Sequence, residues 1–205
     1  RDAIKAFKTT GKFVYTYTDS FGELSNATGA YYLATASSKI WVMPIGGFNF
    51  NGLIAEIPFA KKVLEDYKIM PQMGRREEYK GMVESFTESD FTPPYRQNMQ
   101  RLLDNITTLI INDVAADRNL KPEEVRKILN TAPHTLANAL SAKMIDEIGY
   151  KDQVKSEIEK QVGNKPTYVD FEVYSNTIKE PSQGDQIAIV YAEGTISKNK
   201  MAHNP

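Results

Sequence analysis

Few side chains in this sequence have the chemistry of a nucleophile or of a base. The chain has no cysteine, which excludes a cysteine nucleophile, a disulfide framework and a thiolate metal site. A Ser-His-Asp triad would need one of the two histidines, His134 or His203. His134 follows Pro133 at an expected helix start, where a surface or capping role fits better. The strings GxxxxGKS/T, GxGxxG, HExxH and GxSxG do not occur. We therefore expect no nucleotide or zinc enzyme, no metal and no cofactor.

Two further features have an ordinary structural interpretation when each is taken alone. The segment PIGGFNFNG (44–52) contains Gly46, Gly47 and Gly52, a composition typical of a turn between a strand and a helix. Lys80 stands in REEYKGMVESFT (76–87), between a charged run and an apolar patch. Because lysine is almost never buried, Lys80 by itself indicates a solvated surface residue. Neither feature alone assigns a function.

The composition narrows the class of partner. With 205 residues the chain is long enough to bury a real core. Its 25 basic and 26 acidic residues leave no charge excess to attract nucleic acid or an anionic membrane. No run approaches the roughly 18 apolar residues that span a bilayer, and the start lacks a signal-peptide pattern. Since the chain begins inside a helical pattern and stops after a strand, we expect it to be a piece of a longer protein.

The hydrophobic pattern predicts alternating strands and helices. Strands are expected over 12–18 and 39–44, with a helix of small residues over 27–37 between them. This order within about thirty residues is typical of a βαβ unit in a layered α/β fold. Thr92 is expected to begin a long helix, with Pro93 at its first position. Other helices are predicted near the start of the chain and over 53–67, from 122, over 135–148 and over 152–162, and a last strand over 186–196.

Taken in series, several strings resemble the signal peptide peptidase A family, also called protease IV. The resemblance covers about 11–163 and rests on YYLATASSKIWVMP (31–44), EYKGMVESFT (78–87) and AKMIDEIGY (142–150). QIAIVYAEGTI (186–196) is similar to the strand that opens the second repeat in the long form of that family. The resemblance implies a Clp/crotonase-like α/β fold with additional C-terminal helices. It also implies a lysine-bearing first repeat over 1–163 without its first strands, a linker over 164–184 and the first strand of a second repeat over 185–205.

The resemblance implies a role for Lys80. The family is known for serine peptidases with a Ser/Lys dyad, and Lys80 matches the family's lysine by its place in YKGMVESF. A free lysine has a pKa near 10.4, so a base that works near neutral pH needs a pKa lowered by about 3 units, or about 4 kcal/mol. We therefore expect that the Lys80 amine cannot sit in open water when it acts.

The nucleophile departs from the family pattern. Members that carry it have an alanine-serine-glycine-glycine-tyrosine string, whereas this chain has ATGAY (27–31), which puts Thr28 in place of the serine. The extra methyl group restricts the hydroxyl and crowds its approach to a carbonyl. We interpret Thr28 as a degenerate site and expect the serine beyond Pro205, in the second repeat. The family also places a glycine loop near its substrate groove, at the positions of Gly46, Gly47 and Gly52.

The expected function is that of a serine endopeptidase fragment that supplies the lysine base and is inactive in isolation. Its substrates would be signal peptides or other hydrophobic peptides, at the extracytoplasmic side of a bacterial membrane. The expected partners are the peptide, the repeat carrying the serine and further copies of the chain, with membrane contact only through parts outside this chain. Arg75 and Arg76 are expected to be solvated. The alternatives are a non-catalytic module that oligomerises and shapes a peptide groove, and a crotonase-like acyl-CoA enzyme.

Overall fold

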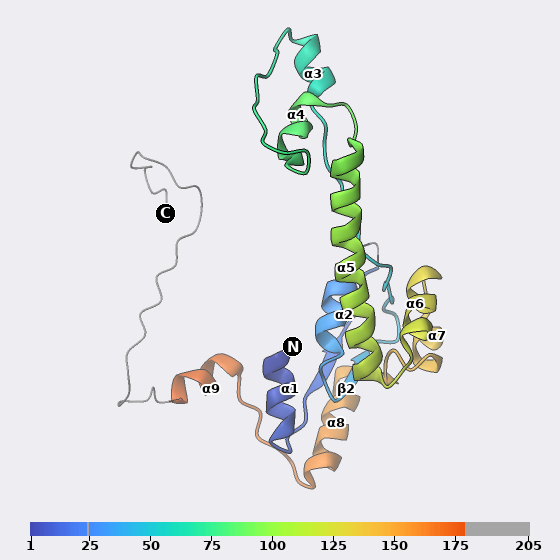
Figure 1. The fold of residues 1–205 in the computed structure, drawn as a ribbon. Coiled ribbons are helices and arrows are strands. Elements are labelled where there is room, and N and C mark those ends of the chain that lie inside the picture. Colours follow the sequence, from blue (N-terminus) through green and yellow to red (C-terminus); the bar gives the residue numbers. More distant parts are fainter. Residues whose placement is uncertain (24, 179–205) are drawn as a thin grey trace. The chain divides into compact units, whose positions relative to one another are not determined.

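The computed structural model describes residues 1–23 and 25–178. The chain divides into two compact units, Arg1–Asn164 and a second that begins at Lys165. The first unit contains a parallel sheet covered by helices, and the described part of the second contains one short helix (Figure 1). The strand predicted over 186–196, the C-terminal part of the predicted linker and His203 lie outside the described residues.

The elements alternate between strands and helices in the first part of the chain and are helical in most of the rest. In chain order they are α1 (Asp2–Thr9), β1 (Tyr15–Thr18), α2 (Thr28–Ala34), β2 (Lys39–Val42), α3 (Lys61–Asp66), the 3-10 helix η1 (Gly81–Val83), α4 (Glu84–Thr87), α5 (Pro93–Arg118), α6 (Pro122–Asn130), α7 (Leu136–Ser141), β3 (Glu147–Ile148), α8 (Lys151–Val162) and α9 (Phe171–Thr177).

The sheet has the order β1-β2-β3, and both pairs of strands are parallel. Tyr15 lies opposite Lys39 at one end of the first pair, and Trp41 lies opposite Glu147 in the second. Because α2 connects β1 to β2, these three elements form the predicted βαβ unit. The α/β class predicted from the sequence is confirmed.

The helix predicted over 135–148 is wrong in its second half. Helix α7 ends at Ser141, and Lys143 adopts a left-handed backbone with φ of 59°, which a continuing helix does not permit. The next residues, Met144 and Ile145, are buried, and the chain then runs beside β2 as β3. A strand of two residues is too short to show its own period, so the sequence pattern alone assigns Ile148 to the preceding helix.

The helix predicted over 53–67 is also shorter than expected. Only Lys61–Asp66 is helical, and the stretch before it has no regular structure. Pro58 lies in the middle of the predicted helix, where it has no N–H to donate and disfavours helical geometry at the residue before it. Ile54, at the start of that stretch, is 80% exposed, so its apolar side chain does not belong to a core-facing stripe.

The core lies around β2, whose Ile40, Trp41 and Val42 are all buried. The helix expected from Thr92 runs over Pro93–Arg118, and its buried residues all lie in its C-terminal half: Ile110, Ile111, Val114 and Ala115. Helix α5 is followed by Asn119, which adopts the left-handed conformation common just after a helix. The N-terminal half of α5 contributes none of the buried residues and carries the α3–α4 segment instead (Figure 1).

Tyr31 connects α2 to the segment that leads into β3. Its side chain is fully buried, packs edge to face on Phe21 and Phe48, and donates a hydrogen bond of 2.7 Å to the Met144 carbonyl. Burial raises the pKa of Tyr31, so the hydroxyl remains a donor at neutral and alkaline pH.

We expect Tyr31→Phe to lower the free energy of unfolding by about 1–2 kcal/mol, because the buried Met144 carbonyl loses its partner. Urea unfolding measures the change. Tyr67→Phe is the matched control, since Tyr67 is 76% exposed and its hydroxyl meets water in both states. Equal effects of the two substitutions would contradict the role given to the Tyr31 hydroxyl.

Candidate active site

The glycine loop lies against the connection between β1 and α2. Phe21 N–H donates to the Gly47 carbonyl at 3.0 Å, and Asn49 N–H donates to the Phe21 carbonyl at 2.8 Å. The two backbones approach so closely that a Cβ on Gly46 would lie 2.0 Å from the Asp19 carbonyl oxygen. The turn interpretation therefore accounts for the glycine at position 46 by close packing alone.

Thr28 lies beside this loop and is connected to it through Asn26. The Asn26 carboxamide accepts from Thr28 N–H at 2.8 Å and donates to the Gly52 carbonyl at 2.5 Å. The structure thus brings together Thr28 and the loop of Gly46, Gly47 and Gly52, which the sequence places some twenty residues apart. The Thr28 side chain is fully buried, and no described residue bonds its Oγ1. A hydroxyl in this position is enclosed by protein and is not presented to a peptide in solvent.

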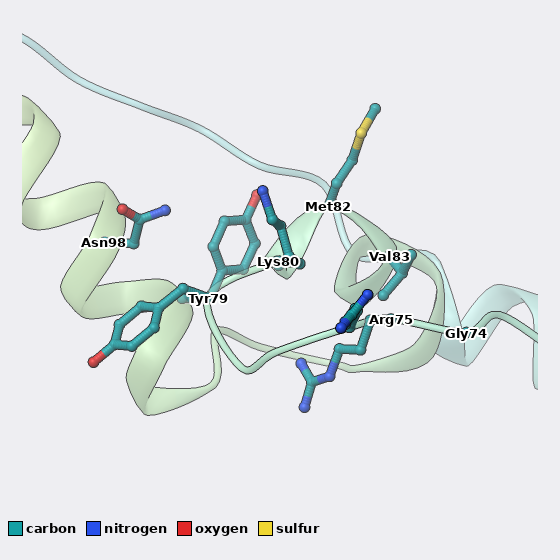
Figure 2. Close-up of a pocket in the computed structure, with 10 residues that line it drawn as sticks. Gly74, Arg75, Tyr79, Lys80, Met82, Val83 and Asn98 are labelled. Carbon is teal, nitrogen blue, oxygen red and sulfur yellow. The ribbon is translucent and has the colours of Figure 1, made fainter.

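Lys80 belongs to a different part of the first unit. It is exposed at the N-terminus of η1 and lines a cavity of about 530 Å³ together with neighbours from its own loop and from α5 (Figure 2). The loop contributes Arg75, Arg76 and Tyr79, and α5 contributes Tyr95 and Asn98. Arg75 and Arg76 thus place two guanidinium groups in the lining of the cavity that Lys80 shares.

The backbone that carries Lys80 packs closely on α5. Gly81 is buried, and a Cβ there would lie 2.4 Å from the ring of Tyr95. Lys80 N–H donates to the Glu77 carbonyl at 3.4 Å, and Glu77 adopts a left-handed backbone with φ of 68°. Any side chain at position 81 would push the Lys80 segment away from the helix.

A buried carboxylate follows Lys80 in the sequence. Glu84, the first residue of α4, is fully buried and forms an ion pair with Arg75. Its second oxygen accepts from the Thr92 hydroxyl at 2.7 Å. Arg75 and Arg76 are both exposed, as expected, and the Arg75 guanidinium is in addition held by this carboxylate. The sequence signal for Glu84 was an acidic residue inside the apolar stretch 82–86.

The segments that carry Thr28 and Lys80 contact α5 at points far apart along the helix. The hydroxyl of Tyr32, in the same helix as Thr28, donates to Asp113 at 2.5 Å, whereas Gly81 packs on Tyr95. Tyr95 and Asp113 are five turns apart, or about 27 Å along the helix. Figure 1 shows α2 and α4 near opposite ends of α5. The two candidate dyad positions are therefore not brought together within the described residues.

His134, the other candidate side chain, has a structural role, and the part of the chain that the structure describes contains neither a metal site nor a membrane-spanning helix. His134 is half-buried, and its Nε2 lies 2.7 Å from the Ile128 carbonyl, which connects the end of α6 to the start of α7. Residues 1–23 and 25–178 contain no group of three His, Cys, Asp or Glu arranged to hold a metal ion. None of the helices in these residues is both long and apolar enough to cross a bilayer.

The comparisons with known proteins agree on one class, the peptidases, and one of the relatives is named a serine protease. The chain matches the model of peptidase family S49 over residues 6–165 and belongs to that family. This range contains Thr28, the glycine loop and Lys80, and the match confirms the resemblance to the signal peptide peptidase A family.

Curated relatives cover nearly the whole chain. It is 26% identical to Protease 4 of Salmonella typhi over 206 residues, which are 95% of this chain and 32% of that protein. Protease 4 of Haemophilus influenzae is also 26% identical over 210 residues, or 95% and 33% of the two chains. The chloroplastic serine protease SPPA of Arabidopsis thaliana is 28% identical over 209 residues, or 98% and 30%. The chain spans about a third of the length of these relatives.

Proposed function

We propose that this chain is the lysine-bearing part of a serine endopeptidase and that Lys80 is its general base. The observation that carries the proposal is the position of Lys80, inside the S49 match and on a cavity that it shares with Arg75 and Arg76. Membership of a peptidase family favours this function over an acyl-CoA enzyme or a non-catalytic module.

We further propose that the nucleophilic serine comes from a second repeat of the same protein. Thr28 is enclosed by protein, and Tyr32 of the same helix bonds Asp113, about 27 Å along α5 from the Tyr95 ring on which the Lys80 segment packs. Lys80 itself is exposed in this chain. A second repeat placed over the cavity would provide the hydroxyl and would also exclude water from the amine.

The chemistry then follows the usual course for acyl transfer. Neutral Lys80 Nζ accepts the proton of the serine hydroxyl while the serine oxygen attacks the scissile carbonyl carbon. The resulting ammonium group gives its proton to the nitrogen of the leaving peptide as the C–N bond breaks. Water then attacks the carbonyl carbon of the acyl-enzyme while it loses a proton to Lys80, and Lys80 returns this proton to the serine oxygen as the ester C–O bond breaks. The second peptide leaves as a carboxylic acid, which loses its proton to solvent.

The surroundings of Lys80 support a hydrophobic substrate such as a signal peptide. Met70, Met73, Tyr79 and Met82 are between 45% and 86% exposed and lie in the same stretch of chain as Lys80. Methionine is unbranched and adapts its shape to different apolar partners. Of the four, Tyr79 and Met82 line the Lys80 cavity itself.

Helix α5 supports the proposed association with further copies of the chain. Its Leu102, Ile106 and Leu109 are between 38% and 56% exposed and lie on one face of the helix. Such a stripe favours a protein partner. The finer architecture, a Clp/crotonase-like fold, and a location outside the cytoplasm at a bacterial membrane remain part of this proposal.

A fluorophosphonate probe tests the origin of the nucleophile. We expect the probe to label a serine outside residues 1–205 when it is added to the whole protein, and mass spectrometry of the digested protein locates the label. The isolated chain should neither bind the probe nor hydrolyse a fluorogenic peptide. Labelling of Thr28 would overturn the divided dyad and make this chain self-sufficient.

Thr28→Val provides a second test, because valine keeps the shape of threonine without the hydroxyl. The Thr28 hydroxyl has no partner among the described residues, so the free energy of unfolding should stay the same or rise by up to about 1 kcal/mol. Peptidase activity of the whole protein should remain within about twofold of the wild type, far from the loss expected of a nucleophile. Thermal unfolding and peptide hydrolysis measure the two quantities.

Thr35→Val is the matched control. Thr35 is equally buried, but its Oγ1 lies 2.9 Å from the Tyr32 carbonyl and 3.1 Å from an Asp117 carboxylate oxygen. Removal of this hydroxyl should cost about 1–3 kcal/mol, because the half-buried Asp117 carboxylate loses a donor. A loss of stability in Thr28→Val as large as in Thr35→Val would show that the Thr28 hydroxyl is bonded.

A further inference from the structure

Glu84 is a charged residue in a place where a charge is costly. Its side chain is 1% exposed, and a carboxylate removed from water is tolerated only when several donors satisfy it. Two donors do so here. The Arg75 guanidinium bonds one oxygen, and the Thr92 hydroxyl bonds the other at 2.7 Å. The carboxylate is therefore fixed by groups from two other segments.

The ion pair between Arg75 and Glu84 joins residues on either side of Lys80 in the sequence. Arg75 lies five residues before Lys80 and Glu84 lies four residues after it, so their ion pair closes the loop that carries Lys80. Thr92 is the N-cap residue of α5 and attaches the closed loop to that helix. Gly81 packs on Tyr95 one turn further along α5. The backbone of Lys80 is thus held at both ends.

The Thr92 hydroxyl bonds the Glu84 carboxylate and not the backbone of its own helix. A threonine at the N-cap ordinarily accepts a hydrogen bond from a backbone N–H in the first turn of its helix. Thr92 makes no such capping bond, and its hydroxyl donates to Glu84 instead. Helix α5 begins without side-chain capping at this position, and the carboxylate gains its second donor.

We infer that Glu84 is a positioning residue for Lys80: through Arg75 and Thr92 it fixes the loop from which the amine reaches the nucleophile. This inference rests on the proposed function of Lys80. A lysine side chain is long and flexible, whereas a catalytic group has to be held within about 0.5 Å of its working position. The position of the Lys80 backbone limits where Nζ can lie.

The test compares variants of the whole peptidase. We expect Glu84→Gln and Thr92→Val to lower kcat at least tenfold with KM within twofold, since substrate contacts remain and the base is misplaced. Thr92→Ser keeps the hydroxyl and should retain kcat within twofold of the wild type. Glu78→Gln is the matched control, because Glu78 is an exposed carboxylate in the same loop.

A second readout does not depend on activity. Reductive ¹³C-methylation of the lysines gives each amine an NMR signal, and the Lys80 signal is identified by its absence in Lys80→Arg. We expect this signal to shift and narrow in Glu84→Gln and Thr92→Val as the loop gains freedom, and to stay unchanged in Thr92→Ser and Glu78→Gln.

The outcomes separate this inference from the proposed function. Full activity of Lys80→Ala would overturn the proposed role of Lys80, and the NMR signal alone would then decide whether Glu84 positions the loop. Loss of activity in Lys80→Ala, with kcat and the Lys80 signal unchanged in Glu84→Gln, would overturn the inference. A kcat for Thr92→Ser as low as for Thr92→Val would overturn it as well, because the hydroxyl would then be irrelevant.

Discussion

Replacement of Lys80 by alanine in the whole peptidase is expected to lower kcat for a peptide substrate by about 10²- to 10⁴-fold, the range typical for loss of a general base. The fold should persist, because Lys80 is exposed and its removal leaves no buried group unpaired. Hydrolysis of a fluorogenic hydrophobic peptide measures the rate, and thermal unfolding monitors the fold.

Lys80→Arg separates the base from a simple positive charge. A guanidinium keeps its proton at any working pH, so it cannot accept one from the serine, and the loss should nearly equal that of Lys80→Ala. Lys62→Ala is the control, since Lys62 is an exposed lysine in α3 that does not line the Lys80 cavity. If Lys80→Arg retained more than about a tenth of the wild-type rate, the base would be another group.

The second large effect is expected at Asp146, which joins the end of α5 to the sheet. Its carboxylate accepts two bonds of 2.9 Å from the Arg118 guanidinium and one of 2.7 Å from the N–H of Ile40 in β2. The Arg118 side chain is 8% exposed. Asp146→Ala should lower the free energy of unfolding by about 3 kcal/mol, because it leaves a nearly buried cation without its carboxylate.

An exposed ion pair of the same chemistry is the control. Asp90 and Arg96 lie 3.1 Å apart, and their side chains are 76% and 61% exposed. Asp90→Ala should change the free energy of unfolding by less than about 1 kcal/mol, since water replaces the lost partner. Urea unfolding of both variants gives the comparison, and similar losses would show that burial of Arg118 contributes nothing.

Local patterns were enough to predict most of the regular elements. The helix that ends before Gly11, the βαβ unit and the helix that begins with Pro122 each carry their signal within a few residues. Glu123 and Glu124 lie in the first turn of α6, where the helix dipole favours them. Strand β3 and the irregular stretch before α3 were missed, because the first forms only beside β2 and the second depends on the single residue Pro58.

One part of the candidate site could likewise be predicted from the local sequence, whereas the other part depends on residues that are far apart in the chain. Lys80 and Thr28 could be found by their place in family strings, which are local. The burial of Thr28, the use of the Thr92 hydroxyl by Glu84 and the pairing of Arg75 depend on residues that meet only in three dimensions. A sequence pattern shows where an N-cap threonine falls, but the bond that its hydroxyl makes depends on the neighbouring segment.

Helix α5 has a mechanical consequence for the proposed site. Its C-terminal half is anchored in the core, and its N-terminal half carries the Lys80 loop through Tyr95 and Thr92. With an arm of about 27 Å, a tilt of about 5° at the anchored end moves the far end by about 2 Å. This displacement exceeds the tolerance of about 0.5 Å for a catalytic group. The helix therefore has the geometry of a lever, and a contact that tilts it through its exposed face, at Leu102 or Leu109, would displace the proposed base several turns away.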